Sequence, residues 1–240
     1  MKLFIVIALI GCMSAIEVEK MEIREGKEVV HESIVFDKHN GRATYHTDDH
    51  CGRKAVTEMV DSNFGIAVSK FDKDDTKHCI VRPYNPSEDS NPNEVSRALV
   101  MTKNEMPDKV EEIKHMFLME PYENAASLPQ HIKNFCAGRA IVTRQVVTTL
   151  KQAAEIAVKQ AKAAKKNSKK RAVLREFTAC TNASTMKIMT CPGDKLRAEC
   201  KIRRSSCTYL VKCPMDLQKG GFDCRGLHKF NSMICCDYNC

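Results

Sequence analysis

The residues with the clearest chemical potential are the thirteen cysteines of this 240-residue chain. Cys12 lies in an N-terminal segment typical of a cleaved leader, so twelve cysteines remain, and an oxidising compartment would pair them as disulfides. Nine of these twelve lie between Cys180 and Cys240. An odd number cannot pair internally, so we expect one of the nine to bond Cys51 or another chain. No Cys-x2-Cys pair repeats, which disfavours a zinc ribbon.

A second group of reactive side chains lies between His46 and Cys51, where two histidines, two aspartates and a cysteine could bind zinc. Polar residues followed by Gly52 at the end of a strand are more typical of a loop, so we predict no metal site. The chain has no Gly-rich phosphate loop, no Gly-x-Ser-x-Gly motif and no helical His pair around a Glu. We therefore predict no catalytic residues, no cofactor and no enzymatic activity.

The elements that would position these residues begin with a run of short strands. Apolar and polar residues alternate between Ala55 and Tyr84, and turn residues interrupt the alternation. The dipeptide Asn40-Gly41 predicts an earlier hairpin. Five strands are expected, at residues 33–36, 42–46, 55–60, 66–71 and 79–81. Short helices are expected at 93–100 and 127–135, whereas 110–119 is either a helix end or a buried strand.

One combination of motifs carries a family resemblance. The run Val60-Asp61-x-x-x-Gly65-Ile66, followed by Cys79-Ile80-Val81 and much later by Cys136, resembles the BRICHOS domain over residues 31–147. The resemblance implies a secreted or lumenal α+β fold, an antiparallel five-stranded sheet with flanking helices. It further implies a Cys79–Cys136 disulfide and a signature acid at Asp61.

The resemblance also bears on the role of Asp61. It implies a buried carboxyl whose charge responds to mild acid in the secretory pathway. The alternative is an exposed turn residue that merely caps Asn63 or Phe64.

The parts that flank this domain differ from it in composition. Lys2 and the apolar residues after it are typical of a signal peptide, although Leu9-Ile10-Gly11-Cys12 could also be a bacterial lipid-attachment box. The tail is too short, and too poor in large apolar residues, to build a sufficient core without disulfides. We expect a signal peptide at 1–15, an N-terminal lead at 16–30, the BRICHOS-like domain at 31–147, a basic helical linker at 148–171 and a small disulfide-rich module at 172–240.

The linker is strongly cationic, with eight Lys or Arg and one Glu in residues 151–171. Such a run could contact polyanions or a membrane surface, but no aromatic residues interleave with it, which disfavours nucleic acid. Lys170-Arg171 is a candidate processing site, and Asn182-Ala183-Ser184 is a candidate N-glycosylation site. The tail and Gln130-His131-Ile132-x-Asn134-x-Cys136 are also similar to the secreted out-at-first proteins.

Three non-enzymatic functions follow. By the BRICHOS resemblance, the chain is a secreted proprotein whose domain acts as an intramolecular chaperone for β-prone stretches of its own tail, such as 208–211 and 233–236. Alternatively, it is the precursor of a cationic disulfide-rich peptide, antimicrobial or signalling, that is released near Lys170-Arg171. A third alternative is an extracellular ligand or matrix protein. The partners would be the tail itself, other β-prone peptides or a second copy of the chain.

Overall fold

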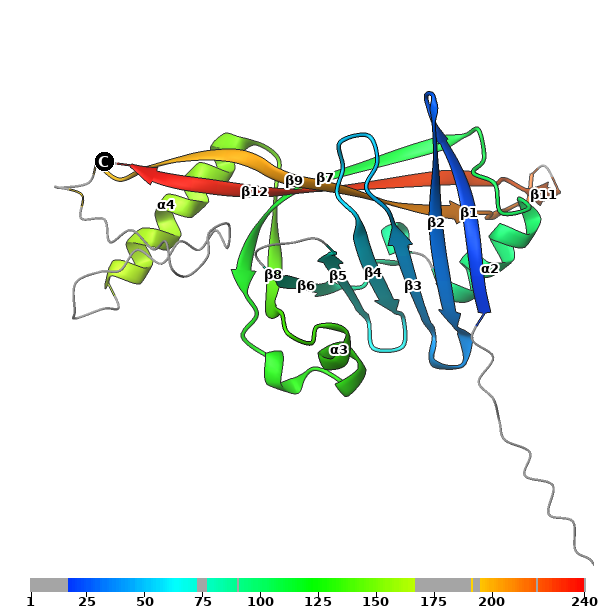
Figure 1. Cartoon of the computed structure of the whole chain (residues 1–240), viewed down its shortest axis with the longest axis horizontal. Coiled ribbons are helices and arrows are strands. Elements are labelled where there is room, and N and C mark those ends of the chain that lie inside the picture. The colour runs from blue at the N-terminus through cyan, green and yellow to red at the C-terminus, as the bar shows by residue number, and fades with distance from the viewer. Residues whose placement is uncertain are drawn as a thin grey trace, which may run out of the picture.

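The computed structural model describes residues 17–72, 77–89, 91–166, 191, 195–218 and 220–239. The predicted signal peptide at 1–15 and the residues Lys170, Arg171 and Asn182 lie outside these ranges. Ten strands form one sheet, in the spatial order β1-β2-β3-β4-β5-β6-β8-β7-β12-β9 (Figure 1). Their bounds are β1 (Glu17–Glu25), β2 (Glu28–Asp37), β3 (Arg42–Thr47), β4 (Val56–Asp61), β5 (Ile66–Phe71), β6 (His78–Pro83), β7 (Val110–Pro121), β8 (Ala140–Val147), β9 (Arg197–Lys212) and β12 (Arg225–Asn239).

The remaining elements are short, apart from two helices. A separate ribbon pairs β10 (Met215–Asp216) with β11 (Gly221–Phe222). The α-helices are α1 (Pro86–Asp89), α2 (Pro92–Met101), α3 (Gln130–Phe135) and α4 (Leu150–Lys166), and 3-10 turns occupy Lys38–Asn40 and Ala125–Ser127. Asn91 caps α2 by accepting from the backbone N–H of Asn93. None of the helices in the described ranges is long and apolar enough to cross a membrane.

The prediction of a five-stranded antiparallel sheet with flanking helices is wrong. The five expected strands do pair in sequence as β2 to β6, but they form only half of a larger mixed sheet. Beyond β6 the chain returns to add β8 in parallel, then β7, β12 and β9. The segment 110–119, which the sequence left open, belongs to strand β7. Consecutive hairpins are visible in a sequence, whereas these non-local pairings are not.

The prediction of a small separate disulfide-rich module is also wrong. Residues Gly226–Met233 of β12 pair in parallel with Val110–Phe117 of β7, and β9 pairs with β12 along its length. An isolated tail would indeed lack a sufficient core, but this tail shares the core of the N-terminal half. Its buried apolar residues include Leu210, Val211, Leu227, Met233 and Ile234. The disulfides Cys200–Cys236 and Cys213–Cys224 join parts of the tail to each other.

Residues 150–166 of the predicted basic linker form the packed helix α4, so the expectation of a linker is corrected for this part; residues 167–171 lie outside the described ranges. Ala153, Ala157 and Ala161 of α4 are buried. Ala153 and Ala157 pack with Leu118, Val147 and Ile234. Because alanine is small, it lets the helix backbone approach the strands closely, while Lys151 and Lys159 remain exposed on the opposite side. The N-terminal lead is likewise ordered, since Met21 and Ile23 of β1 are fully buried.

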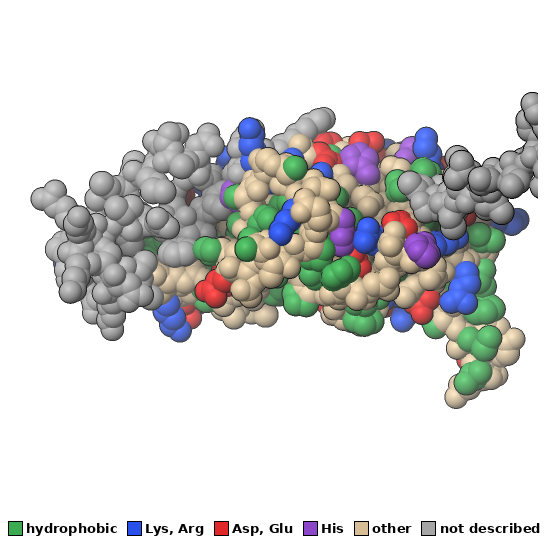
Figure 2. Space-filling model, turned by 90° about the horizontal axis from the view of Figure 1, so that it is seen from below, with side chains coloured by type: hydrophobic (Ala, Val, Ile, Leu, Met, Phe, Trp, Pro, Cys, Tyr) green, Lys and Arg blue, Asp and Glu red, His purple; other side chains and the backbone are tan. Residues whose placement is uncertain are grey.

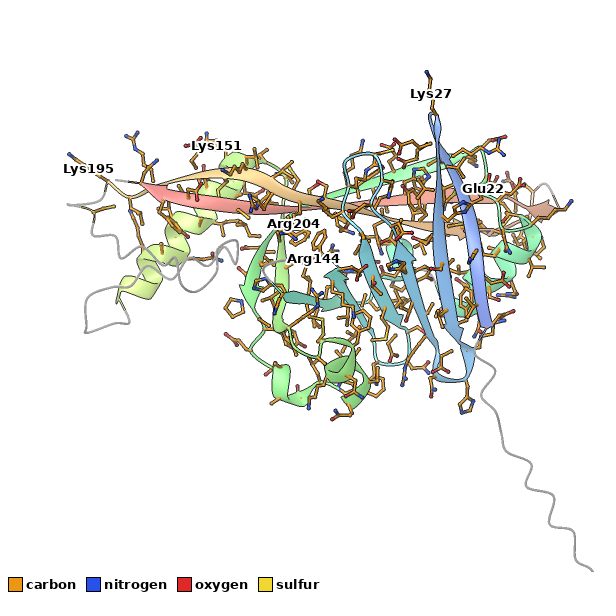
Figure 3. All side chains as sticks on the ribbon, viewed as in Figure 1. Glu22, Lys27, Arg144, Lys151, Lys195 and Arg204 are labelled. Carbon is orange, nitrogen blue, oxygen red and sulfur yellow. A yellow bond between two sulfur atoms is a disulfide. The ribbon has the colours of Figure 1, made fainter. Side chains whose placement is uncertain are left out.

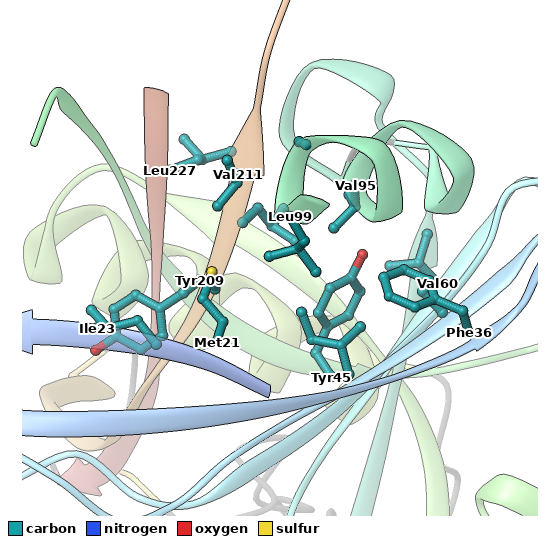
Figure 4. Packing of buried hydrophobic residues seen from close by; sticks show 14 of the residues in the cluster. Met21, Ile23, Phe36, Tyr45, Val60, Val95, Leu99, Tyr209, Val211 and Leu227 are labelled. Carbon is teal, nitrogen blue, oxygen red and sulfur yellow. The ribbon is translucent and has the colours of Figure 1, made fainter. Parts of the chain in front are cut away.

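The main core lies where the sheet curls over itself. β7, β9 and β12 run crosswise to β1–β4 (Figure 1), and β9 contacts both β3 and β4. Helix α2 closes the same space. The core residues labelled in Figure 4 come from β1–β4, α2, β9 and β12: Met21, Ile23, Phe36, Tyr45, Val60, Val95, Leu99, Tyr209, Val211 and Leu227. The N-terminal half and the tail therefore share one hydrophobic core.

Candidate functional site

Asp61 lies at the end of β4 and is fully buried. Its Oδ2 accepts a hydrogen bond from Arg42 Nε at 3.1 Å and lies 2.7 Å from His131 Nε2. Its Oδ1 accepts from the backbone N–H of Phe64 at 2.9 Å. Asp61 is therefore buried, as the BRICHOS resemblance implies, and it also caps its turn at Phe64, so the alternative of an exposed turn residue is wrong. The response to mild acid stays a prediction.

The Asp61 site faces the lower side of the molecule in Figure 1, where the β4–β5 turn and α3 lie. Figure 2 looks onto this side and shows cationic, anionic, histidine and hydrophobic side chains interspersed. The Phe64 ring is 57% exposed and lies 5.5 Å from the His131 ring, measured between centroids. The buried carboxylate is therefore covered by a partly exposed aromatic residue and a histidine.

The disulfide implied by the BRICHOS resemblance is present between Cys79 of β6 and Cys136, the residue that follows α3. Both cysteines are buried in a cluster with Met59, Val81 and Ile132. Since His131 and Ile132 are on the same short helix, the disulfide holds the helix that places His131 beside Asp61. A helix of six residues has little stability of its own and depends on such contacts.

We predict that Asp61→Asn lowers the free energy of unfolding by about 1.5–3 kcal/mol, the range for hydrogen bonds to charged groups. Asparagine still accepts from Phe64, but the side chains of Arg42 and His131 lose the negative charge. Asp37, which is more exposed and lies 3.8 Å from Arg42, provides a matched control. In urea unfolding, Asp37→Asn should lower the free energy of unfolding by less than about 1 kcal/mol. Equal losses in the two variants would contradict this account of the site.

A second cluster of charged side chains lies inside the curled sheet. It consists of four residues that are at most 5% exposed and that come from β4, β6, α1 and β12: Glu58, Arg82, Asp89 and Lys229. Lys229 Nζ donates to Glu58 at 2.6 Å and to Asp89 at 2.9 Å. Arg82 donates to the same two carboxylates. Its Nη1 donates to Asp89 Oδ2 and its Nη2 donates to Glu58 Oε1, each at 2.6 Å. A cation from the tail is therefore paired with anions of the N-terminal half.

The charges of this cluster keep its carboxylates ionised. Burial alone would raise the pKa of Asp89, but the positive charges of Lys229 and Arg82 outweigh burial and hold that pKa well below its usual range. For Glu58 too, the positive charges of Lys229 and Arg82 outweigh the effect of burial, so the pKa of Glu58 is lowered. Buried ions of this kind tolerate the low-dielectric interior only while every partner stays in place.

Glu32 of β2 is a fourth buried carboxyl, and its protonation state differs from that of Glu58 and Asp89. Its Oε2 accepts from Thr47 Oγ1 at 2.6 Å and from the backbone N–H of Tyr209 at 3.0 Å. In the absence of a paired cation, burial raises the pKa of Glu32 to about 8. The group is therefore mainly protonated at neutral pH, and its contact with Tyr209 again joins the N-terminal half to β9.

The raised pKa of Glu32 predicts a pH dependence of stability. Between the ordinary glutamate value of 4.5 and about 8, the folded protein binds more protons than the unfolded chain, so this contribution to stability is lost as pH rises. The slope is at most about 1.4 kcal/mol per pH unit. Glu32→Gln should flatten the fall in stability between pH 5 and 8, measured by urea unfolding, whereas the exposed control Glu28→Gln should keep it. An unchanged slope in Glu32→Gln would refute the assignment.

The loop that contains His50 and Cys51, which could have bound zinc, instead contacts β9. His50 lies 2.6 Å from Tyr209 Oη, and the Lys54 N–H donates to the Ser205 carbonyl. His46 points elsewhere, to Thr57 and Asp72. Across the described part of the chain, no three His, Cys, Asp or Glu side chains are grouped closely enough to hold a metal ion.

Two cysteines in the described ranges take no part in a disulfide. Cys191 and Cys235 each take part in a disulfide, in addition to the three disulfides above. Cys51 and Cys207 are free. Cys207, buried in β9, is thus a tail cysteine outside the disulfides, and Cys51 is exposed in the loop that covers β9.

The charged cluster was missed because each of its members is unremarkable alone. For Glu58 the sequence held one indication of burial, because the alternation in β4 places Glu58 on the same face as Val56 and Val60. A carboxylate at an inward position needs a buried cation. Nothing local identified Lys229, because its partners are 171 and 140 residues away.

No known protein family, curated protein or solved structure matches this chain. The resemblance to BRICHOS domains therefore stays a prediction that rests on Asp61, Cys79 and Cys136.

Proposed function

We propose that this chain is a secreted protein whose N-terminal half acts as the folding template of its own cysteine-rich tail. This is the intramolecular chaperone role that the BRICHOS resemblance implies, with the tail retained in the folded product. The observation that carries the proposal is Lys229, a tail residue whose ammonium group is buried against Glu58 and Asp89 of the N-terminal half.

The charges of the two halves are complementary. Without the tail, Glu58 and Asp89 would share only Arg82 as a close cation. Without the N-terminal half, Lys229 would lose both of its anionic partners. Leaving a buried charge without its partner costs about 3–5 kcal/mol. The N-terminal half is therefore destabilised without the tail, which favours folding of the tail on the N-terminal half.

The backbone supports the same role. β12 covers one edge of β7 by parallel pairing, and β9 then pairs with β12. Without these strands, β7 would be an open edge of twelve residues, and such edges accept extended segments. A reduced tail with nine cysteines has very many incorrect pairings open to it. Alignment on β7 would bring Cys200 and Cys236 into register, and these two residues are direct partners across β9 and β12.

Secretion from cells tests the proposal. Residues 172–240 behind a signal peptide would be compared with the full chain, and with the tail co-expressed alongside residues 1–171 as a separate chain. We expect heterogeneous disulfides from the tail alone and a homogeneous product from the other two arrangements. Co-expression of residues 1–171 carrying Glu58→Gln and Asp89→Asn should fail to restore the homogeneous product. Equal yields of homogeneous tail in every arrangement would refute a templating role.

The precursor alternative has a distinct outcome in the same experiment. In residues 16–171, Cys79 and Cys136 are bonded to each other and Cys51 is free, so cleavage at Lys170-Arg171 would leave the halves joined by non-covalent contacts. Mass spectrometry of the medium would find the tail as a free peptide if release is the function. The proposal expects the tail to remain bound to the N-terminal half.

A further inference from the structure

A groove lies between helix α2 and the β10–β11 ribbon, at the end of the molecule opposite to the labelled Lys195 in Figure 3. Its volume is about 510 Å³, measured as the space open to the centre of a water-sized particle. Cavities that bind small molecules usually measure about 300–1,000 Å³. None of the lining residues belongs to the Asp61 site or to the charged cluster.

Much of the lining is apolar and partly exposed. Met101 of α2 is 44% exposed, Met215 of β10 is 62% exposed and Phe222 of β11 is 55% exposed, whereas Val211 of β9 is buried. Large apolar side chains that gather in a groove and stay in contact with water indicate a surface that a ligand can cover. Methionine side chains adapt their shape to such a ligand.

The ribbon that forms one side of the groove is held in place by its own contacts. The Cys213–Cys224 disulfide joins the residues that flank the ribbon. Its two acids are engaged within the fold, since Asp223 pairs with Lys109 at 2.6 Å and Asp216 caps the turn that follows it. A preformed groove loses little conformational entropy when a ligand binds.

Two cations of the lining have no carboxylate partner. Within the described ranges, Arg97 forms no ion pair and no side-chain hydrogen bond. Lys212 Nζ donates to the backbone carbonyls of Pro86 and Ser87. Burial, and after it the charge of Arg225, lowers the pKa of Lys212. An anion in the groove would therefore stabilise the charged form of Lys212.

The acids near these two cations are already paired, with one exception. Glu111, which acts on Lys212 in the opposite direction to burial, lies 3.1 Å from Arg225. Asp89, which acts in the same way, is held by the cations of the charged cluster. Glu94 is the single acid of the lining itself. Two cations without carboxylate partners against one acid favour a ligand with one negative charge.

We propose that this groove binds a single-chain anionic amphiphile of the fatty-acid class. Its carboxylate would lie at Arg97 and Lys212, where the hydrogen bonds would be charge-assisted. Its alkyl chain would cover Met101, Met215 and Phe222 and remove their exposed apolar surface from water. This binding activity goes beyond the proposed function and does not depend on it.

Calorimetry of the full chain with ligands that share one alkyl chain tests the site. Sodium decanoate would be compared with decylammonium chloride and with decanol, all below the concentrations at which they aggregate. We expect one decanoate to bind per chain, at least about tenfold more tightly than decylammonium or decanol, because only the carboxylate gains hydrogen bonds to charged groups. Decanoate should also shift the NMR signals of the methyl groups of Met101 and Met215.

Two pairs of variants locate the site. Arg97→Gln and Phe222→Ser should each weaken decanoate binding about tenfold. The matched controls Arg24→Gln and Val29→Ser, on β1 and β2, change an exposed arginine and an exposed valine away from the groove and should leave the affinity unchanged. The comparison of ligands on the wild type stays decisive if a variant fails to fold.

Three results would each overturn the proposal. The first is equal affinity of the wild type for decanoate and decylammonium, and the second is unchanged decanoate affinity in Arg97→Gln. The third is sedimentation of the chain with phosphatidylglycerol vesicles without any binding of free decanoate, because the groove would then be part of a membrane-docking surface.

Discussion

Replacing Lys229 with methionine should lower the free energy of unfolding by about 3–5 kcal/mol, the cost of leaving a buried charge without its partner. The side chain of Lys229 is 1% exposed, and its ammonium group contacts both Glu58 and Asp89. Methionine fills a similar volume, so the loss reflects the missing charge rather than a cavity. The measurement is urea unfolding at pH 7 with the disulfides intact.

Two further variants distinguish the loss of the charge from non-specific destabilisation. Lys201→Met removes an exposed lysine of the neighbouring strand, whose side chain is 69% exposed, and should change stability by less than about 0.5 kcal/mol. Glu58→Gln combined with Lys229→Met removes one anion together with the cation, so the double variant should be more stable than Lys229→Met alone. If Lys229→Met were as stable as the wild type, the buried cluster would not join the two halves.

Removing the Cys79–Cys136 disulfide should cost about 4 kcal/mol in the chain-entropy account, since the crosslink closes a loop of 57 residues. Alanine at both positions avoids leaving a polar group in the buried cluster that contains them. We expect thermal unfolding at a markedly lower temperature and the loss of ordered contacts around α3, including the contact between His131 and Asp61.

The Cys213–Cys224 disulfide provides the comparison, because its loop spans only 11 residues and its removal should cost about 3 kcal/mol. The Asp61 site should be undisturbed in that variant. NMR of the His131 ring would report the difference. A stable Cys79→Ala/Cys136→Ala variant with an unchanged His131 signal would show that α3 does not need the disulfide.

Local sequence patterns were sufficient to predict that β2 to β6 are consecutive antiparallel strands. Period-2 alternation and turn residues predicted β3 to β6 to within two residues at each end, but missed the first five residues of β2. The resemblance implied the acid Asp61 and the Cys79–Cys136 disulfide, but not that His131 of α3 would lie beside Asp61. These features depend on residues close together in sequence or on a motif. The outer half of the sheet depends on pairings between distant segments, for which single-sequence patterns carry little information.

The tail was predicted to be a separate disulfide-rich module because of its cysteines, its short length and its few large apolar residues. Lys229 is nevertheless buried, because Glu58 and Asp89 of the N-terminal half neutralise it. The Ala/Lys helix was misread for a similar reason, since an alanine face looks weakly apolar in isolation. It becomes a close-packing surface once β8, β9 and β12 lie beneath it.

The central claim, that the N-terminal half and the tail form one fold held by the sheet and the buried charges, is tested most directly by cutting between them. A site-specific protease sequence would be inserted after Arg171 in a Cys51→Ser background. This background removes the single cysteine of residues 16–171 that lies outside the Cys79–Cys136 disulfide, so no crosslink can join the halves. After cleavage, the account predicts that both fragments elute together on gel filtration with unchanged circular dichroism and separate only in denaturant. Elution of the tail alone, still folded and with its disulfides complete, would contradict it.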